Sequence, residues 1–183
     1  MTRKEAIELL HTYVKNPNLI KHSLASEAVM RALAVRLGGD PDLWGLAGLL
    51  HDLDAELEPD LSTHTVRTTE ILKSKKVPEE VINAIKLHNE LPWGEKRWDP
   101  MHFALAAGEN LTGLIIASAL VVPEKKLESL QVKSVIKRMK EKRFAPGANR
   151  ETIKEALRLG LSLEEFVEIC LNAMKNIAHQ LGL

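Results

Sequence analysis

An all-α protein, a compact helical bundle, is the fold class that the sequence predicts. Hydrophobic residues make up 45% of the 183 residues but aromatic residues only 4%, so Leu, Ile, Val and Ala must fill the core, which suits helices better than sheets. Apolar residues recur at helical spacing, and the alternation typical of strands is nearly absent. A chain of this length buries about 70% of its unfolded surface, so the bundle needs no disulfide to be stable.

The N-terminal part of the chain contains three expected helices. The first covers residues 4–15 and is closed by an Asn-Pro-Asn sequence at 16–18. The second covers residues 19–37, where apolar side chains form one stripe, and a Gly-Gly pair at 38–39 stops it. An Asp-Pro pair then supplies an N-cap and a proline at the first helical position, which opens a third helix over residues 40–52.

Three more helices are expected in the middle of the chain. Ser62 can cap a helix that runs to residue 73, a proline begins one over residues 78–88, and a second Asp-Pro pair opens a long helix over residues 99–123. Its stretch 101–122 is the most apolar of the chain but carries Glu109, and the uncharged remainder is too short to cross about 30 Å of hydrocarbon. We therefore interpret it as a buried core helix and expect no membrane partner.

The last third of the sequence predicts helices over residues 132–142, 150–159 and 163–181. Ser162 and Glu165 have the spacing of a capping box at the start of the last of these helices. Because the chain contains no internal repeat, low-complexity tract or break in composition, one domain over all its residues is expected.

This single domain, 1–183, is expected to divide into a helical core at about 19–122 and a C-terminal helical extension at about 124–183. Lys plus Arg and Asp plus Glu number 25 each, so no overall basic field attracts a nucleic-acid polymer. The first residues mix charges with apolar side chains and lack the apolar core of a secretory signal, so a cytoplasmic location is expected. A homo-oligomer is left open.

Histidines and carboxylates are the metal ligands that this sequence offers. Its single cysteine, Cys170, excludes cysteine-rich metal sites. His51 and His88 lie among apolar neighbours, where an imidazole taken alone is more often a hydrogen-bonded core residue. Glu109 lies in the middle of the most apolar helix, so it needs a compensating cation. A metal held by histidines is one source of that charge, and a distant Arg or Lys or an exposed stripe is the alternative.

The ordered set of these residues resembles the HD superfamily of metal-dependent phosphohydrolases, which is named for an adjacent His-Asp pair. The set is His22, His51-Asp52, His64, His88 and Glu109. The stretch Gly48-Leu49-Leu50-His51-Asp52-Leu53 looks like the hallmark of the family, and the resemblance covers about residues 19–119. Two positions depart from the pattern: Glu109 stands where the family usually has Asp, and Asp54 stands where a glycine is often found.

The resemblance implies a helical bundle of the HD type that binds one or two divalent transition-metal ions, with Fe, Mn, Co, Ni or Zn suited to such ligands. One metal would be held by His22, His51, Asp52 and Glu109, and Asp52 would bridge to a second metal completed by His64 and His88. If His64 lies on a surface turn, a single metal remains. Asp52 would then serve catalysis through the metals, and Asp54 is the best candidate for orienting a ligand or protonating a leaving group.

Charged and aromatic residues elsewhere can be interpreted either as ordinary surface and packing residues or as ligand-binding residues. The acidic residues between 52 and 60 are mostly interpreted as solvated, and the loop at 91–98 either stacks on a base and neutralises phosphate or packs over the core. In the basic C-terminal third, Lys133, Arg143 and Arg150 are candidate ligands of a substrate phosphate, against the alternative of a solvated helix face.

The leading functional hypothesis is a metal-dependent phosphohydrolase that hydrolyses a phosphate ester of a small molecule, a nucleotide or a phosphomonoester, by metal-activated water. The substrate is thus a small phosphorylated molecule. A metal-binding regulatory module with little turnover is the alternative that Glu109 motivates. A di-iron oxygenase with the same ligands is a third, less favoured hypothesis.

Overall fold

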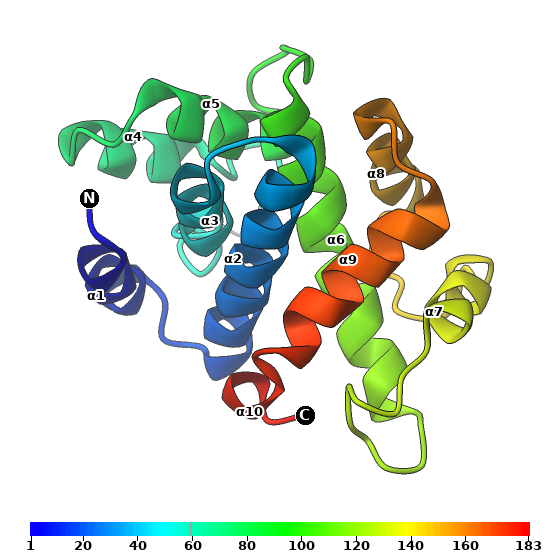
Figure 1. Cartoon of the computed structure of the whole chain (residues 1–183). Coiled ribbons are helices and arrows are strands. Elements are labelled where there is room, and N and C mark those ends of the chain that lie inside the picture. The colour runs from blue at the N-terminus through cyan, green and yellow to red at the C-terminus, as the bar shows by residue number, and fades with distance from the viewer. Residues whose placement is uncertain (59) are drawn as a thin grey trace.

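The computed structural model describes residues 1–58 and 60–183, and within them the protein is all-α, as predicted, with no strand (Figure 1). The elements in chain order are α1 (Arg3–Tyr13), α2 (Pro17–Leu37), α3 (Pro41–Leu50), α4 (Val66–Ser74), α5 (Glu79–His88), α6 (Pro100–Leu120), α7 (Val132–Met139), α8 (Arg150–Lys154), the 3-10 helix η1 (Glu155–Leu159), α9 (Leu163–Lys175) and α10 (Ala178–Leu181).

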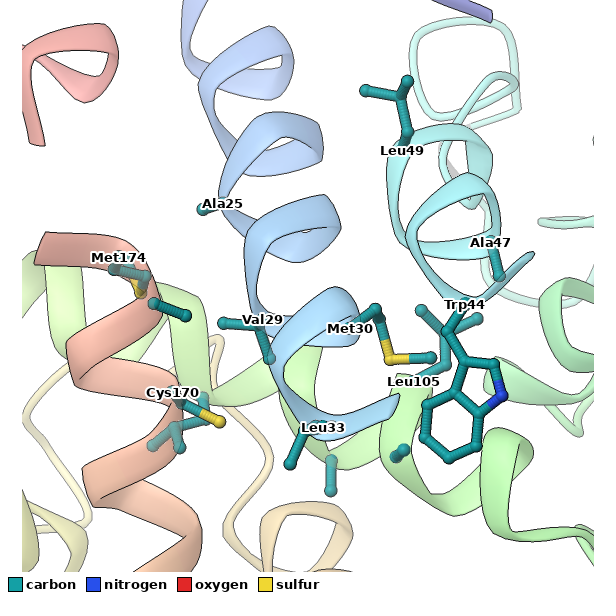
Figure 2. Close-up of a cluster of buried hydrophobic side chains, with 14 of the residues drawn as sticks. Ala25, Val29, Met30, Leu33, Trp44, Ala47, Leu49, Leu105, Cys170 and Met174 are labelled. Atoms are coloured by element: carbon teal, nitrogen blue, oxygen red, sulfur yellow. The ribbon is translucent and has the colours of Figure 1, made fainter. Parts of the chain in front are cut away.

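Helix α2 lies at the centre of the bundle and packs against α3, α6 and α9. Figure 2 shows this core: Val29 on α2 faces α9, whereas Met30 lies toward Trp44 on α3. Helix α6 has the length and composition of a membrane-crossing helix, yet 67% of its most apolar window is buried inside the protein. The interpretation of the stretch 101–122 as a buried core helix therefore agrees with its position in the structure.

Helices α2 and α3 approach each other closely at Gly48. A Cβ atom at this position would lie 2.4 Å from the backbone oxygen of Ser26, a separation that real Cβ atoms do not show. The glycine of the hallmark stretch is therefore required by packing. Because His51 follows about one turn later, at the end of α3, this close crossing also sets where the His-Asp pair lies relative to α2.

The predicted Asp-Pro helix starts are confirmed. The carboxylate of Asp40 accepts the N–H groups of Asp42 and Leu43, and that of Asp99 accepts the N–H of Met101. The Asn-Pro-Asn sequence, expected only to close the first helix, in fact opens the second, because the side chain of Asn16 accepts the N–H of Asn18. Helix α2 therefore begins two residues earlier than expected.

The expected start of the fourth helix is wrong. Ser62 lies in a turn and donates its N–H to Asp60 Oδ1, whereas α4 begins at Val66. The third helix likewise ends at Leu50, so His51 is its C-cap and the residues after it form turns. In both places side chains more than ten residues away contact the backbone. Asn89 donates to the oxygens of Leu61 and His64, and Thr68 Oγ1 accepts the N–H of Asp54. A local sequence pattern does not reveal such contacts.

The C-terminal helices differ from expectation mainly in length. Helix α7 ends at Met139 rather than at residue 142, the second half of the expected helix at 150–159 is 3-10, and the last expected helix is split into α9 and α10. Ser162 does accept the N–H of Glu165, but the Glu165 carboxylate pairs with Arg36 at 2.6 Å instead of completing a capping box.

Two polar contacts tie this C-terminal part to the elements around the His-Asp pair. Arg97 pairs with both carboxylate oxygens of Glu155 on η1, at 2.7 and 2.9 Å. Asn110 on α6 accepts the backbone N–H of Asn149 at 2.9 Å, just before α8. The loop before α8 is thereby held beside the middle of α6.

Candidate metal centre

The structure brings all six residues of the predicted metal-binding set together. Each comes from a different place in the fold: His22 lies in the first half of α2, His51 caps α3, Asp52 follows it, His64 lies in the turn before α4, His88 is the last residue of α5, and Glu109 lies in the middle of α6. The interiors of two helices, the ends of two others and one turn thus converge on a point beside the centre of the bundle.

One half of the centre, which we call the helix half, contains His22, His51 and Glu109. The Nε2 atoms of the two histidines lie 3.1 Å apart. Asp52 Oδ2 lies 3.6 Å from His22 Nε2 and 3.4 Å from His51 Nε2, while Glu109 Oε2 lies 3.7 Å from His22 Nε2. The longer Glu109 side chain therefore reaches the same imidazole as Asp52 does.

The other half, which we call the turn half, contains His64 and His88. Their Nε2 atoms lie 3.2 Å apart, and Asp52 Oδ1 lies 3.1 Å from that of His64 and 3.5 Å from that of His88. Asp52 thus directs one carboxylate oxygen to each half. His64 does lie in a turn, but its side chain is only 11% exposed and faces the centre, so the condition that would leave a single metal, a surface turn, is not met.

The far side of each imidazole is anchored by an acceptor. Nδ1 of His51 lies 2.9 Å from the carbonyl oxygen of Gly48, and that of His88 lies 2.6 Å from the carbonyl oxygen of Ile85. Because a carbonyl can only accept, both Nδ1 atoms must carry the hydrogen. The same holds for His22, because Thr112 donates its hydroxyl hydrogen to the backbone oxygen of Glu109 and so accepts from His22 Nδ1 at 3.0 Å.

In the helix half this arrangement leaves the Nε2 lone pairs of two neutral histidines, His22 and His51, facing each other. Burial lowers the pKa of His51 to about 3, against the attraction of Asp52, and also lowers the pKa of His22. At neutral pH two lone pairs therefore meet at 3.1 Å, an arrangement that is repulsive unless a cation lies within reach of both. Imidazole nitrogens and carboxylate oxygens suit a transition metal, so the residues present fit the metal ions that the sequence implied.

The carboxylates of the centre differ in charge. Burial opposes the ionisation of Asp52, but the surrounding histidines outweigh it and hold its pKa well below the usual value. Burial and the nearby charge of Asp52 raise the pKa of Glu109 well above its usual value, and Asn110 Nδ2 donates to its Oε1. Without a cation, Glu109 therefore keeps its proton to higher pH than Asp52 does.

Asp54 acts on His64 rather than on the open cavity. Its side chain is fully buried, and its Oδ1 lies 2.8 Å from His64 Nδ1. Its Oδ2 accepts the N–H groups of Thr65 and Thr68, so it also caps α4 from eleven residues upstream. Of the two predicted roles, orienting a ligand agrees with this geometry, while protonation of a leaving group does not, because the carboxylate lies away from the cavity.

A cavity of about 1070 Å³ opens beside the centre, with Asp52, His64, His88 and Glu109 on its lining. The loop before α8 forms another part of the cavity lining. The basic residues that line the cavity are Lys96, Arg97, Lys142 and Arg150. Pockets for small molecules typically have about 300–1,000 Å³, so the site has room for a small-molecule ligand.

The three predicted phosphate ligands are placed differently. Arg150 lines the cavity, but its guanidinium donates to the backbone oxygens of Phe144, Ala145 and Ala148 and so fixes the preceding loop. Lys133 and Arg143 do not line the described cavity. Sequence reasoning missed Asn110 and Asn149, whose contact joins α6 to this loop, because no local pattern relates them.

Two of the large side chains in the loop at 91–98 contact the rest of the protein and are not available to bind a ligand. Trp93 donates its indole N–H to Thr65 Oγ1 at 2.8 Å, and Arg97 is committed to Glu155 and to the backbone oxygens of Leu87 and His88. Trp98 is 72% exposed. The interpretation as a packing loop thus fits Trp93 and Arg97.

An all-α bundle with a His-Asp pair at the end of one helix and further histidines around it is a helical protein whose clustered side chains could hold a metal ion. The profile of the HD domain family matches residues 19–139. The chain belongs to the HD domain family, which comprises metal-dependent phosphohydrolases that bind divalent metals.

Curated relatives of this chain are ribonuclease Y proteins. That of Clostridium botulinum (strain Hall) is 25% identical over 166 residues, 90% of this chain and 26% of the relative. Those of Alkaliphilus metalliredigens and Nitratiruptor sp. are 33% and 38% identical over 73 residues, 39% of this chain and 15% and 14% of the relatives. The chain thus spans about a quarter or less of these relatives. No solved structure gives a significant match.

Proposed function

We propose that the protein hydrolyses a phosphate ester of a small molecule, a nucleotide or a phosphomonoester, by metal-activated water. The observation that carries the proposal is the pair of neutral imidazoles in the helix half, whose Nε2 atoms face each other at 3.1 Å beside the shared carboxylate of Asp52. Membership in a family of metal-dependent hydrolases supports it.

The residues divide the work between holding metal and holding substrate. His22, His51, Asp52 and Glu109 are the ligands in the helix half, and Asp52, His64 and His88 those in the turn half. One or two divalent ions held there, of Fe, Mn, Co, Ni or Zn, would supply hydroxide from bound water near neutral pH and would polarise a phosphoryl oxygen. Asp54 orients His64 through its Nδ1, and no side-chain nucleophile is needed.

Substrate binding is assigned to the cavity beside the centre. The ammonium groups of Lys96 and Lys142 lie along its lining and attract a phosphorylated ligand, although Lys96 is also 2.8 Å from Glu90. Since the Arg97 and Arg150 guanidinium groups are already bound to carboxylate or carbonyl oxygens, these two lysines are better candidates for phosphate contact than either arginine.

Metal analysis followed by hydrolysis assays tests this proposal. The purified protein is analysed for bound metal and then assayed on a panel of nucleotides and phosphomonoesters with added Mn²⁺, Co²⁺ or Ni²⁺. Metal-dependent phosphate release that is lost in His51→Ala supports it. Turnover that is unaffected by both chelator and His51→Ala contradicts it.

A phosphodiester bond of RNA is a second candidate substrate. The observation that favours it is the similarity to proteins named ribonuclease Y across 90% of this chain. A short single-stranded RNA, compared with the matching mononucleotides under the same metal conditions, separates the two. Cleavage of the oligomer without release of phosphate from mononucleotides favours the RNA phosphodiester.

Two alternatives concern turnover itself. A regulatory module with little turnover predicts that Glu109→Asp raises hydrolysis strongly at unchanged metal content, whereas loss of activity in this variant indicates that Glu109 is a working ligand. The position of Glu109 Oε2, 3.7 Å from His22 Nε2, favours the working ligand. A di-iron oxygenase would instead require oxygen and give a mixed-valent iron signal.

A further inference from the structure

We propose that Trp93 is a positioning residue for the turn half of the metal centre: it locks the backbone at Thr65 and thereby fixes the imidazole of His64. The inference rests on the proposed function, because it assumes that His64 binds metal. It assigns a role to a residue in the loop at 91–98, outside the ligand set.

The backbone next to His64 is strained. Thr65 has φ 83° and ψ −16°, in the left-handed region that a β-branched residue rarely adopts. The other non-glycine residues at positive φ in the described part of the chain, Lys76, Lys125 and Ala145, are not β-branched. Such a conformation persists only where its surroundings enforce it, so the contacts of Thr65 must hold it in place.

Hydrogen bonds hold Thr65 through its backbone and through its hydroxyl group, which also donates to the backbone oxygen of Lys86 at 3.4 Å. The backbone N–H of Thr65 donates to Asp54 Oδ2 at 2.9 Å, and its hydroxyl oxygen accepts the indole N–H of Trp93 at 2.8 Å. Asp54 directs its other oxygen to His64 Nδ1 at 2.8 Å. Since Thr65 is fully buried, water cannot replace these bonds. One connected group of contacts, the hydrogen bonds of Thr65 and the ion-pair contact between Asp54 and His64, therefore sets the conformation of Thr65 and the orientation of His64.

Trp93 is itself held in place for this role. The ammonium group of Lys86 lies 4.7 Å from the centre of its ring, and Lys86 also pairs with Glu95 at 2.6 Å. By contrast Trp98, in the same loop, is 72% exposed, lies edge-on to His102 with ring centroids 5.0 Å apart, and makes no side-chain hydrogen bond to a described residue. Trp98 is therefore a matched control.

The experiment compares metal binding in five variants with the wild type. Trp93→Phe removes the indole N–H but keeps an aromatic ring, and Thr65→Val removes the hydroxyl but keeps the branched side chain. Trp98→Phe and Thr65→Ser are their controls, and His64→Ala marks the loss of the turn half. Metal content is measured by elemental analysis, affinity by titration calorimetry with Mn²⁺, and folding by thermal unfolding of the metal-free protein.

In Trp93→Phe and Thr65→Val, we expect the second Mn²⁺ to bind at least about tenfold more weakly, as for loss of an outer-shell contact, while the first Mn²⁺ is unaffected. Both controls should bind two ions as the wild type does. A merely structural role would weaken both ions together, and that result overturns the inference.

The inference and the proposed function fail in different ways. If Trp93→Phe and Thr65→Val bind both ions with wild-type affinity while His64→Ala loses one, Trp93 does not position the turn half, and the proposed metal centre is retained. If the wild type binds no Mn²⁺, Co²⁺ or Ni²⁺, the proposed function is wrong and the inference falls with it. Because Thr65→Val and Trp93→Phe break the same bond, failure of one to fold leaves the other as the test.

Discussion

The helix half of the metal centre is carried by long core helices, whereas the turn half depends on a single turn held by distant side chains. His22 and Glu109 are internal residues of α2 and α6, and His51 caps α3 at a close crossing of helices. His64 instead precedes α4, next to a residue at positive φ, and relies on Asp54 for its orientation.

Two metal sites that share one carboxylate can therefore have different structural support. The packing of the core fixes the helix half, so only a change in the core disturbs it. Hydrogen bonds among a few polar groups fix the turn half, so single polar substitutions should disturb it while the fold remains intact. Selective loss of one metal is the experimental sign of this asymmetry.

Removal of the shared charge should give the largest effect. In Asp52→Asn both halves lose their common ligand, so we expect metal content near zero and hydrolysis reduced by more than about 100-fold, the upper end found for outer-shell residues. Elemental analysis and phosphate release measure the two effects. Asp60→Asn, in the same acidic segment but exposed, should match the wild type. Retention of two metals in Asp52→Asn would show that Asp52 does not link the halves.

A substitution at Asp54 should affect the turn half selectively. Asp54→Asn keeps an oxygen for the N–H groups of Thr65 and Thr68 but removes the charge beside His64 Nδ1. The second metal should bind about 10–100-fold more weakly, with the first unchanged. Titration calorimetry with Mn²⁺ measures both affinities. Equal weakening of the two would contradict the asymmetry.

A substitution at Gly48 tests the support of the helix half. Gly48→Ala forces a methyl group against the backbone oxygen of Ser26, so the free energy of unfolding should fall by about 1–3 kcal/mol, and His51 should shift with α3. Urea unfolding in the presence of a chelator measures this loss. Gly113 has open space where a Cβ would lie, so Gly113→Ala should be neutral or stabilise by up to about 1 kcal/mol. Equal stability of the two variants would contradict the close packing at Gly48.

Proton release should also distinguish the halves. Although burial alone lowers the pKa of His64, its bonds to Asp52 and Asp54 raise it to about 10, whereas the pKa of His51 falls to about 3. The metal-free protein therefore carries a proton on His64 at neutral pH, and metal in the turn half must displace it. The affinity of that half should rise with pH up to about 10.

Calorimetry at pH 7 in buffers of different ionisation enthalpy counts the protons released, and His64→Ala should abolish the release that accompanies the second metal. The raised pKa of His64 also makes the stability of the metal-free protein depend on pH. Because the folded pKa is raised, the contribution of His64 to the metal-free fold is fully present below about pH 6.5 and is lost as pH rises toward about 10. An unchanged proton count in His64→Ala would contradict this assignment.

The sequence predicted the helix half better than the turn half, for a physical reason. Apolar periodicity and Asp-Pro starts place α2, α3 and α6 within a few residues, and the order of histidines and carboxylates suggested which residues meet. The all-α fold and the family follow from those local signals. Such signals indicate which face of a helix is buried and where the helix ends. The ligands of the helix half lie on such faces or at such an end, so these signals were enough to place them.

The support of the turn half could not be predicted because it depends on long-range contacts. Asp54 caps α4 from eleven residues upstream, and Trp93 reaches Thr65 from a different loop, so Ser62 was expected as the cap in their place. Similarly, the guanidinium of Arg150 is bound to backbone oxygens that only the folded loop presents. A sequence pattern shows which groups are present but not which of them are already paired.

Anomalous scattering from a crystal of the protein grown with Mn²⁺ tests directly whether Asp52 lies between two metal sites. We expect two peaks on either side of Asp52, one contacted by His22, His51 and Glu109 and the other by His64 and His88. A peak at other residues, or none at Asp52 in protein that binds Mn²⁺ in solution, would contradict this expectation.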